Sequence, residues 1–382
     1  MRFSQIPGLH ETKEQLINAV KTNHVAHALL FDGASGSAAL PMALAFSAYV
    51  NCENPTENDS CGACPSCLKI DKIAHPDFIF AYPTAGGKKV LSENFIKQWR
   101  DFVKENPFAG LSDWLEYIEI KQGNIPVEES RQIIQNLSLK SYEGGYKIVL
   151  IWMVEAMGQS AANALLKILE EPPEKTLFLL VTNDSNRLLT TIISRTQRIA
   201  VRNLSESEMV TFLTDSNGLN HERAAQIAFL SEGNINRAFE ILNKKDQNEK
   251  DWFANWMRYC YAFDLTKLIP LADEFDALTK ESQKSLLDYG LKIIREIYLE
   301  CVGAKNLIKL EGDELIFVQK FSRVFKFENL DKISEAISEA QMLIERNVRA
   351  KIMFLDLSLT ISRLIKYKTS RIPPEGQIFK FS

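Results

Sequence analysis

Four cysteines lie close together in the sequence, at Cys52, Cys61, Cys64 and Cys67. One C-x8-C step is followed by two C-x2-C steps, which bring successive sulfurs onto one tight turn. Four thiolates are the usual ligand set of structural zinc, and a reducing compartment disfavours disulfides. All four ligands come from the protein, so no coordination position is left for a substrate. The pattern predicts one structural zinc ion, and the alternative is four unlinked reduced cysteines.

A glycine-containing turn between a predicted strand and a predicted helix has the position of a phosphate-binding loop. The turn contains Gly33 and Gly36. A working loop needs a Lys that neutralises phosphates and a Ser or Thr that holds magnesium. Ala39 stands at the Lys position and Leu40 at the hydroxyl position. The loop is therefore degenerate, and an ordinary tight turn is the alternative interpretation.

The acidic residues of a nucleotide-hydrolysing site are missing as well. In such a sheet, the strand beside the loop ends in carboxylates that hold magnesium and activate water. Here the apolar segment 148–151 ends in Trp152 and Met153. Two matched losses predict an ATPase scaffold that neither hydrolyses ATP nor binds it tightly. We expect Trp152 and Met153 to fill the space of the metal with apolar packing.

The overall composition is that of a globular protein. The chain has 382 residues, of which 46% are hydrophobic and 25% charged, with a net charge of -4. These values exclude the disordered, collagen-like and disulfide-dense classes. A pI near 5.9 argues against a protein that coats nucleic acid through bulk positive charge. The apolar runs are far shorter than a membrane span and the first residues do not resemble a signal peptide, so we expect a soluble, cytoplasmic protein without membrane contact.

The first 200 residues alternate apolar strands with helices. Strands are predicted at 28–31, 147–154, 176–181 and 197–201, and a helix at 160–171 ends at Pro172 and Pro173. Buried apolar strands separated by helices indicate a parallel sheet covered on both faces. We expect an α/β domain over 1–203 that carries the cysteine module at 52–67. Glycines and Asn106-Pro107 interrupt residues 84–123, which we interpret as an insertion.

The remainder of the chain is predicted to be helical. Helical patterns at 205–214, 220–231 and 234–244 form a small unit over 204–245. The polar run 243–251 is predicted to be a linker, and 246–382 a separate helical domain. An apolar stripe with helical spacing extends over 329–367. We interpret this stripe as bundle core, and a face that packs on other subunits is the alternative.

Several short strings of the chain occur together in one protein family. They are Ile6-Pro7-Gly8, His27-Ala28-Leu29-Leu30-Phe31, the four cysteines, His75-Pro76-Asp77, the segment 161–173, and Ser194-Arg195-Thr196. With these strings the chain resembles the delta-prime subunits of bacterial DNA polymerase III clamp loaders, which belong to the AAA+ superfamily. The resemblance is strong over about residues 5–240. It implies an AAA+ domain with an inserted zinc module, a helical lid and an all-α C-terminal collar domain used for oligomerisation.

The resemblance also implies a function. Clamp loaders are rings of subunits that use ATP to place a sliding clamp on primed DNA. The expected partners are an ATPase subunit and a delta-type subunit, with the clamp and DNA reached through the complex. The protein would be a component of the DNA polymerase III holoenzyme without an ATPase activity of its own. Arg195 would be the arginine finger that acts in trans on a neighbour's ATP.

Two departures from the family pattern and several alternatives accompany this interpretation. Thr196 replaces the Cys of the family's Ser-Arg-Cys motif, and the insertion at 84–123 exceeds the expected length. For Arg195 the alternative is an ion pair with a local acid such as Asp184. Arg237 resembles the nucleotide-sensing arginine of the lid, and we expect it to form an interdomain ion pair instead. The competing functions are a divergent AAA+ ATPase that acts on its own and a zinc-module nucleic-acid-binding protein.

Overall fold

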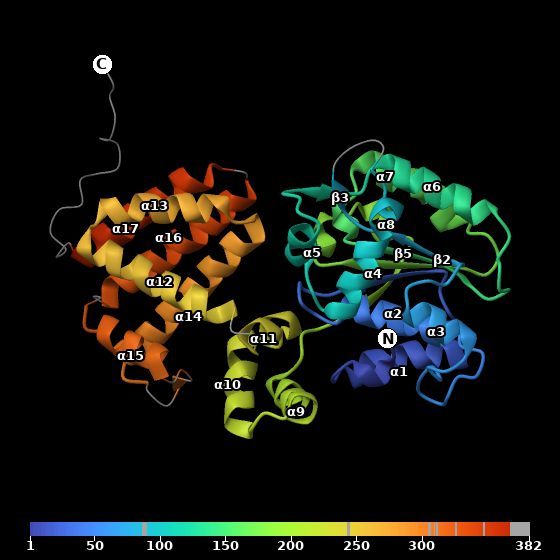
Figure 1. Ribbon diagram of the computed structural model, residues 1–382, viewed down its shortest axis with the longest axis horizontal. Helices are drawn as coiled ribbons and strands as arrows, with labels where there is room; N and C mark the ends of the chain where they lie inside the picture. Colours follow the sequence, from blue (N-terminus) through green and yellow to red (C-terminus); the bar gives the residue numbers. More distant parts are fainter. Residues whose placement is uncertain are drawn as a thin grey trace, which may run out of the picture. The chain divides into compact units, whose positions relative to one another are not determined.

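The chain forms two compact units, residues 1–243 and 244–382. The computed structural model describes residues 1–85, 90–242, 245–304, 307–308, 310, 312–324, 327–346 and 348–366. The first unit contains a parallel sheet with flanking helices, and the described part of the second is helical (Figure 1). The predicted α/β fold, followed by a helical region, is thus confirmed.

Five parallel strands form the sheet of the first unit in the order β2-β5-β6-β1-β7. Their bounds are Ala28–Asp32 for β1, Phe78–Ala81 for β2, Lys147–Trp152 for β5, Thr176–Thr182 for β6 and Gln197–Ala200 for β7. Every residue of β5 and β6 is buried, as expected for strands covered on both faces. Because β6 lies between β1 and β5, the strand that ends in Trp152 is not beside the loop strand, and that part of our prediction was wrong.

Helices cover both faces of this sheet (Figure 1). Successive strand residues point to opposite faces, so Leu29 and Phe31 of β1 join one apolar cluster and Leu30 joins the other. The helices α1 (His10–Lys21), α2 (Ala39–Val50) and α3 (Pro65–Asp71) contribute to the first cluster. The helices α6 (Val127–Ser138) and α7 (Gln159–Glu170) contribute to the second. The sheet and the helices on its two faces therefore form three layers. This arrangement positions the loop that follows β1.

The insertion is an integral part of the first unit. Its ends pair as the short antiparallel strands β3 (Thr84–Ala85) and β4 (Gly123–Asn124), and it contains α4 (Ile96–Glu105) and α5 (Leu111–Tyr117). Trp99 and Trp114 are fully buried. The Trp99 ring lies 4.2 Å from the Tyr82 ring and 5.1 Å from the Trp152 ring. Aromatic burial of this kind makes the insertion a part of the core rather than an appended loop.

The three helices α9 (Glu206–Asn217), α10 (His221–Ser231) and α11 (Ile235–Leu242) form the lid region of the first unit. Ser205 and Glu208 form a capping box at the start of α9. The Glu208 carboxylate also accepts a hydrogen bond from the Leu9 N–H at 3.2 Å and pairs with Arg202 at 2.7 Å. One side chain therefore joins the N-terminal segment, the segment after β7 and the lid.

The second unit corrects the predicted linker. Helix α12 extends over Lys245–Ala262, so the polar run is helical from Lys245 onward, and Asn243 and Lys244 lie outside the described residues. The helix forms because its next turns place Phe253, Trp256 and Met257 in the apolar core of the bundle. The other helices are α13 (Leu265–Ala277), α14 (Lys280–Cys301), α15 (Gly312–Phe321), α16 (Phe327–Glu345) and α17 (Ala350–Lys366).

The apolar stripe at 329–367 belongs to two helices. Along α16 most of the predicted positions are buried, for example Ile333 and Ile337, whereas Leu343 is half-buried. Along α17 the buried face contains Phe354 and Leu357, whereas the predicted Ile352 is 59% exposed. The break between α16 and α17 resets the helical phase, so a single stripe could not describe both helices.

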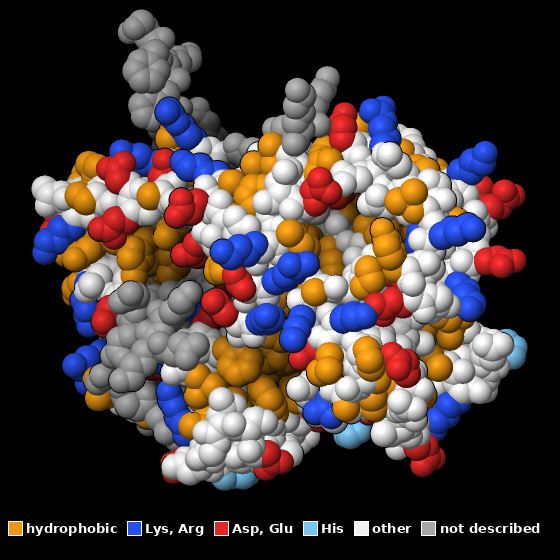
Figure 2. Space-filling view, turned by 45° about the vertical axis from the view of Figure 1, so that its right-hand side comes forward, with side chains coloured by type: hydrophobic (Ala, Val, Ile, Leu, Met, Phe, Trp, Pro, Cys, Tyr) orange, Lys and Arg blue, Asp and Glu red, His pale blue; other side chains and the backbone are white. Residues whose placement is uncertain are grey.

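The surface is mixed in character. On the face shown in Figure 2, Lys and Arg side chains are interspersed with Asp, Glu and hydrophobic ones, in keeping with a net charge of -4. Within the described residues, no helix combines the length and the apolar character needed to cross a membrane.

We predict that Glu208→Gln lowers the stability of the protein at neutral pH by about 1–2 kcal/mol, because it removes a charged hydrogen-bond acceptor. The hydrogen bonds from Arg202 lower the pKa of Glu208 to about 2, from an ordinary value of 4.5. A lowered pKa means that this contribution is present above pH 4.5 and is lost as the pH falls toward 2. Urea unfolding at pH 7, 5 and 3.5 should therefore show a difference between variant and parent that narrows with acidity. Glu222→Gln, in the first turn of α10, removes the same charge and should leave stability nearly unchanged.

Candidate metal centre and degenerate phosphate-binding loop

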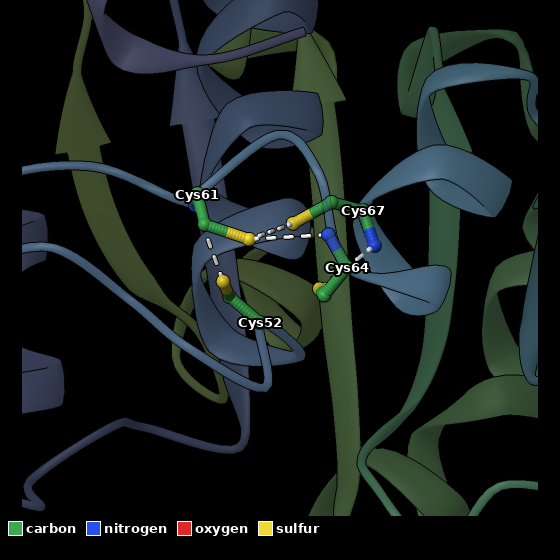
Figure 3. Close-up of side chains that lie close together, drawn as sticks. All are labelled: Cys52, Cys61, Cys64 and Cys67. Atoms are coloured by element: carbon green, nitrogen blue, oxygen red, sulfur yellow. Dashed lines mark hydrogen bonds between the residues drawn. The ribbon is translucent and has the colours of Figure 1, made fainter.

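The four predicted cysteines meet at one point in the structure. The sulfurs of Cys52, Cys61, Cys64 and Cys67 all lie within 4.8 Å of one another and point toward one another (Figure 3). Cys52 follows α2, Cys64 is the N-cap of α3 and Pro65 is its first residue. The short helix thus presents two of the sulfurs to the turn that carries the others.

Backbone N–H groups surround these sulfurs. The Cys61 sulfur accepts hydrogen bonds from the N–H groups of Ala63 at 3.4 Å and Cys64 at 3.3 Å, and the Cys52 sulfur accepts one from Cys61 at 3.2 Å. The first two bonds lower the pKa of Cys61 to about 6, whereas burial raises the pKa of Cys52 and of Cys67. A bound cation favours the thiolate form of all four, since thiolates are the metal-binding species. The cluster could therefore hold a metal ion.

The degenerate loop has the predicted place between strand and helix. β1 ends at Asp32 and α2 begins at Ala39, so the loop comprises residues 33–38. The side chains of Ala39 and Leu40 are buried. At the position where a Lys would reach phosphates, the protein has a buried methyl group.

The end of β5 is equally apolar. Trp152 and Met153 are each only 2% exposed. The Trp152 ring lies 5.1 Å from Trp99 and 6.3 Å from Phe102, both on α4 of the insertion. The expected apolar packing at this position is present, and the insertion supplies the aromatic rings that complete it.

The lid contacts the loop directly. The Asn234 side chain donates a hydrogen bond to the Ser35 carbonyl at 2.8 Å, and the Ile235 N–H donates to the Gly36 carbonyl at 3.1 Å. A Cβ atom added to Gly36 would lie 2.0 Å from the Asn234 side-chain oxygen, and the φ of Gly36 is +75°. Glycine is needed here for the backbone conformation and for the close approach of the lid.

The insertion contacts both the loop and the lid. A Cβ atom added to Gly110 would lie 2.7 Å from the Ser35 hydroxyl. The Asn236 side chain donates to the Asp113 carboxylate at 3.0 Å and accepts from the Asn106 side chain at 2.6 Å. Loop, lid and insertion therefore form one connected set of contacts. Neither Asn236 nor Asp113 was singled out from the sequence, although Asn236 directly precedes the lid-type Arg237.

Sequence reasoning also missed a half-buried acid at this end of the sheet. Glu155, three residues beyond β5, accepts hydrogen bonds from the Thr182 hydroxyl at 2.8 Å and the Asn183 N–H at 2.9 Å. Burial raises the pKa of the Glu155 carboxyl. The Thr182 carbonyl accepts from the Gly33 N–H at 3.2 Å, which links this acid to the loop. The signal that could have found Glu155 is an acid soon after a fully apolar strand.

Arg195 lies between α8 (Thr190–Ile193) and the edge strand β7. Its guanidinium donates to the Glu170 carboxylate at 2.7 Å and to the Thr191 carbonyl at 2.9 Å. The local acid is therefore Glu170 at the end of α7 and not Asp184, whose carboxylate caps the turn at 185–187.

Arg237 lies on α11. It forms an ion pair with Glu240 at 3.0 Å, one turn further along the same helix. The expected interdomain ion pair stays a prediction.

A model of the family described as DNA polymerase III, delta subunit matches residues 8–205, which is more than half of the chain. The chain belongs to this family. The resemblance to clamp-loader subunits of the AAA+ superfamily is thereby confirmed. The matched range includes the cysteine cluster, the degenerate loop, the insertion and Arg195, and it ends where α9 begins.

Relatives of two kinds are similar to this chain. The delta' subunit of DNA polymerase III from Escherichia coli K12 is 24% identical over 66% of this chain and 65% of its own length. The delta' subunit from Yersinia pestis is 31% identical over 50% of this chain and 45% of its own. The tau/gamma subunit from Haemophilus influenzae is 29% identical over 54% of this chain and 25% of its own. The chain therefore covers a quarter to two thirds of the length of these relatives.

Among solved structures, a gamma subunit-related protein from Thermotoga maritima aligns over 93% of this chain and 100% of its own length, with a TM-score of 0.39 and 16% identity.

Proposed function

We propose that the protein is a non-hydrolysing, delta-prime-type subunit of a DNA polymerase III clamp loader. In this role it assembles with an ATPase subunit and a delta-type subunit and helps load the sliding clamp onto primed DNA. Family membership and the delta' relatives support the clamp-loader role. The observation that carries the delta-prime assignment is the apolar filling of the site, in which Ala39, Leu40, Trp152 and Met153 are all buried.

The apolar filling of the site is relevant to whether the protein is of the delta' kind or of the tau/gamma kind. An ATPase subunit of the tau/gamma kind would need a cation at position 39 and carboxylates at 152 and 153 to compensate the charge of a magnesium-bound triphosphate. An uncompensated triphosphate beside buried methyl and aromatic groups is strongly unfavourable. No feature of the site favours the alternative of a divergent ATPase that acts on its own.

We predict that the isolated protein binds magnesium-ATP with no measurable affinity in the micromolar range and does not hydrolyse it. Isothermal titration calorimetry and a phosphate-release assay on the purified chain check both points. Binding with a micromolar Kd would contradict the proposal, even without turnover.

We also propose that the cysteine cluster holds a structural zinc ion. Four sulfur donors within 4.8 Å of one another fit the tetrahedral preference of zinc, and the thiolate set selects it over magnesium or calcium. The zinc would fix the excursion between α2 and β2. Asp59 ties that excursion to the N-terminal segment by accepting hydrogen bonds from the N–H groups of Phe3 at 3.0 Å and Ser4 at 2.9 Å.

We predict that elemental analysis of the purified protein finds one zinc ion per chain. Cys64→Ser removes one of four ligands and should abolish stoichiometric zinc and lower the thermal midpoint of the first unit. Cys301→Ser, in the helical unit and remote in sequence from the cluster, should keep the zinc. A Cys64→Ser protein with full zinc and full stability would show that the cluster is not a metal site.

Arg195 is our proposed arginine finger in trans. It is positioned by the end of α8 and the start of the edge strand, so its guanidinium lies at the border of the sheet. A guanidinium is permanently charged and its donors match phosphate oxygens. Glu170 can hold it in the isolated chain without preventing exchange, since an exposed ion pair contributes only about 0–1 kcal/mol.

We predict that Arg195→Ala leaves the protein folded, zinc-loaded and able to assemble, but lowers ATP hydrolysis by the reconstituted complex by up to about 10³-fold. Steady-state hydrolysis and clamp-loading assays measure this effect. Arg198→Ala is the matched control, because Arg198 is an exposed arginine on β7 that pairs with Asp32 at 2.5 Å.

A second variant separates the finger from a purely local ion pair. Glu170→Ala breaks the same ion pair but keeps the guanidinium, so it should leave hydrolysis near the normal rate. If Glu170→Ala and Arg195→Ala slow the complex equally, the ion pair itself is responsible and Arg195 is not a finger.

A further inference from the structure

The strand β2 forms one edge of the sheet. It pairs with β5 on one side, and the sheet has no further strand beyond it among the described residues. The Ile148 N–H donates to the Asp77 carbonyl at 2.9 Å, and Phe78 and Phe80 are the register partners of Ile148 and Leu150. In a parallel ladder the peptide groups of alternate residues turn to opposite sides. Those of Phe78 and Phe80 therefore face away from β5.

Most of the outward polar groups near the ends of β2 are already paired. The Phe78 N–H donates to the His75 carbonyl at 3.1 Å, and Ser92 pairs with both the N–H and the carbonyl of Tyr82, at 3.0 and 3.2 Å. Between them, the Phe78 carbonyl and the N–H and carbonyl of Phe80 have no hydrogen bond within the described part of the chain. Along the strand, these three groups are spaced like one repeat of the hydrogen-bond pattern between two paired strands. An edge of this kind is a template for another strand.

A cavity of about 400 Å³ runs along this edge. Helix α4 borders it with Ile96 and Arg100, and α6 borders it with Gln132 and Ile133. Its volume lies within the range of ligand-binding clefts. Two exposed apolar side chains, Leu139 at 60% and Tyr142 at 81%, also line it. The cavity thus offers backbone partners at its base and apolar groups along its border.

The acids that line the cavity are already paired. The Asp77 carboxylate accepts hydrogen bonds from the Tyr142 N–H at 2.8 Å and the Ser141 hydroxyl at 2.9 Å. The Glu129 carboxylate accepts from the Ser92 N–H at 2.8 Å, and the Glu93 carboxylate accepts from the Gln132 side chain. Neutral donors of the protein itself therefore hold these carboxylates in place.

Two cations of the same cavity retain free donors. Lys140 is exposed and has no partner among the described residues. Arg100 donates through its Nε to the Ile73 carbonyl at 2.8 Å, and its two terminal nitrogens have no partner among the described residues. These free donors can pair with a carboxylate of an occupant.

We propose that the β2 edge docks an extended peptide segment of a partner protein, with an acidic side chain directed to Lys140 and Arg100. The segment adds a strand to the sheet through the Phe78 carbonyl and both polar groups of Phe80. This is the β-augmentation mode, in which main-chain hydrogen bonds give affinity and side-chain pockets give selectivity. The proposal does not depend on the clamp-loader role and concerns the edge opposite to Arg195.

The test is a selection of phage-displayed random heptapeptides on the full chain. We expect enrichment of acidic, β-branched sequences and, for a synthetic peptide of the enriched sequence, slower amide hydrogen exchange at Phe80. Lys140→Glu should weaken binding of that peptide by about tenfold, since one charge contact is reversed. The control Lys121→Glu reverses an exposed lysine of the insertion and should leave the affinity within about twofold of the parent.

Three outcomes would overturn the proposal. The first is a selection without enrichment, and the second is a peptide that binds Lys140→Glu as tightly as the parent. The third is exchange at Phe80 that stays fast with peptide bound, or that slows merely when the concentration of the chain itself is raised. The last result would assign the edge to pairing between two copies of this chain.

Discussion

The backbone of the loop after β1 takes its hydrogen-bond partners from the chain itself. Here Asn234 and Ile235 of the lid bond the carbonyls of Ser35 and Gly36, and Gly33 bonds the end of β6. Because these bonds satisfy carbonyl groups of the loop, they hold the lid directly against the loop. The position of the lid relative to the loop follows from these hydrogen bonds.

The insertion contacts the end of β5 and the lid with apolar and polar side chains. Its aromatic residues Trp99 and Phe102 pack on Trp152, and its polar residues Asn106 and Asp113 bind Asn236 of the lid. Apolar packing and amide–carboxylate bonds thus hold the insertion against the end of β5 and against the lid.

The sequence predicted this site well where the signal is local. The cysteine spacing and the loop depend on residues that are near in the chain, and the structure gathers the cysteines and places the loop between β1 and α2. The expected neighbourhood of β1 and β5 depends on distant segments, and it was wrong. Pairings between distant segments were out of reach. The bond from Asn236 to Asp113 spans 123 positions, and the pair of Arg195 with Glu170 depends on how α7 ends beside β7. The linker was mistaken because Lys245–Asp251 is polar, whereas helix formation there follows from Trp256 and its neighbours in the bundle core.

The order of the strands gives the first unit two chemically different borders. At β2 the sheet has peptide groups without a partner among the described residues. Near the other edge lie Arg195, two residues before β7, and Arg198 on β7. Three strands separate these borders, and at about 4.8 Å per strand step the borders lie roughly 19 Å apart. Groups at this separation with no shared contacts contribute additively to free energies. A molecule bound at one border and a subunit bound at the other would therefore act on this sheet independently, and neither would alter the affinity of the other.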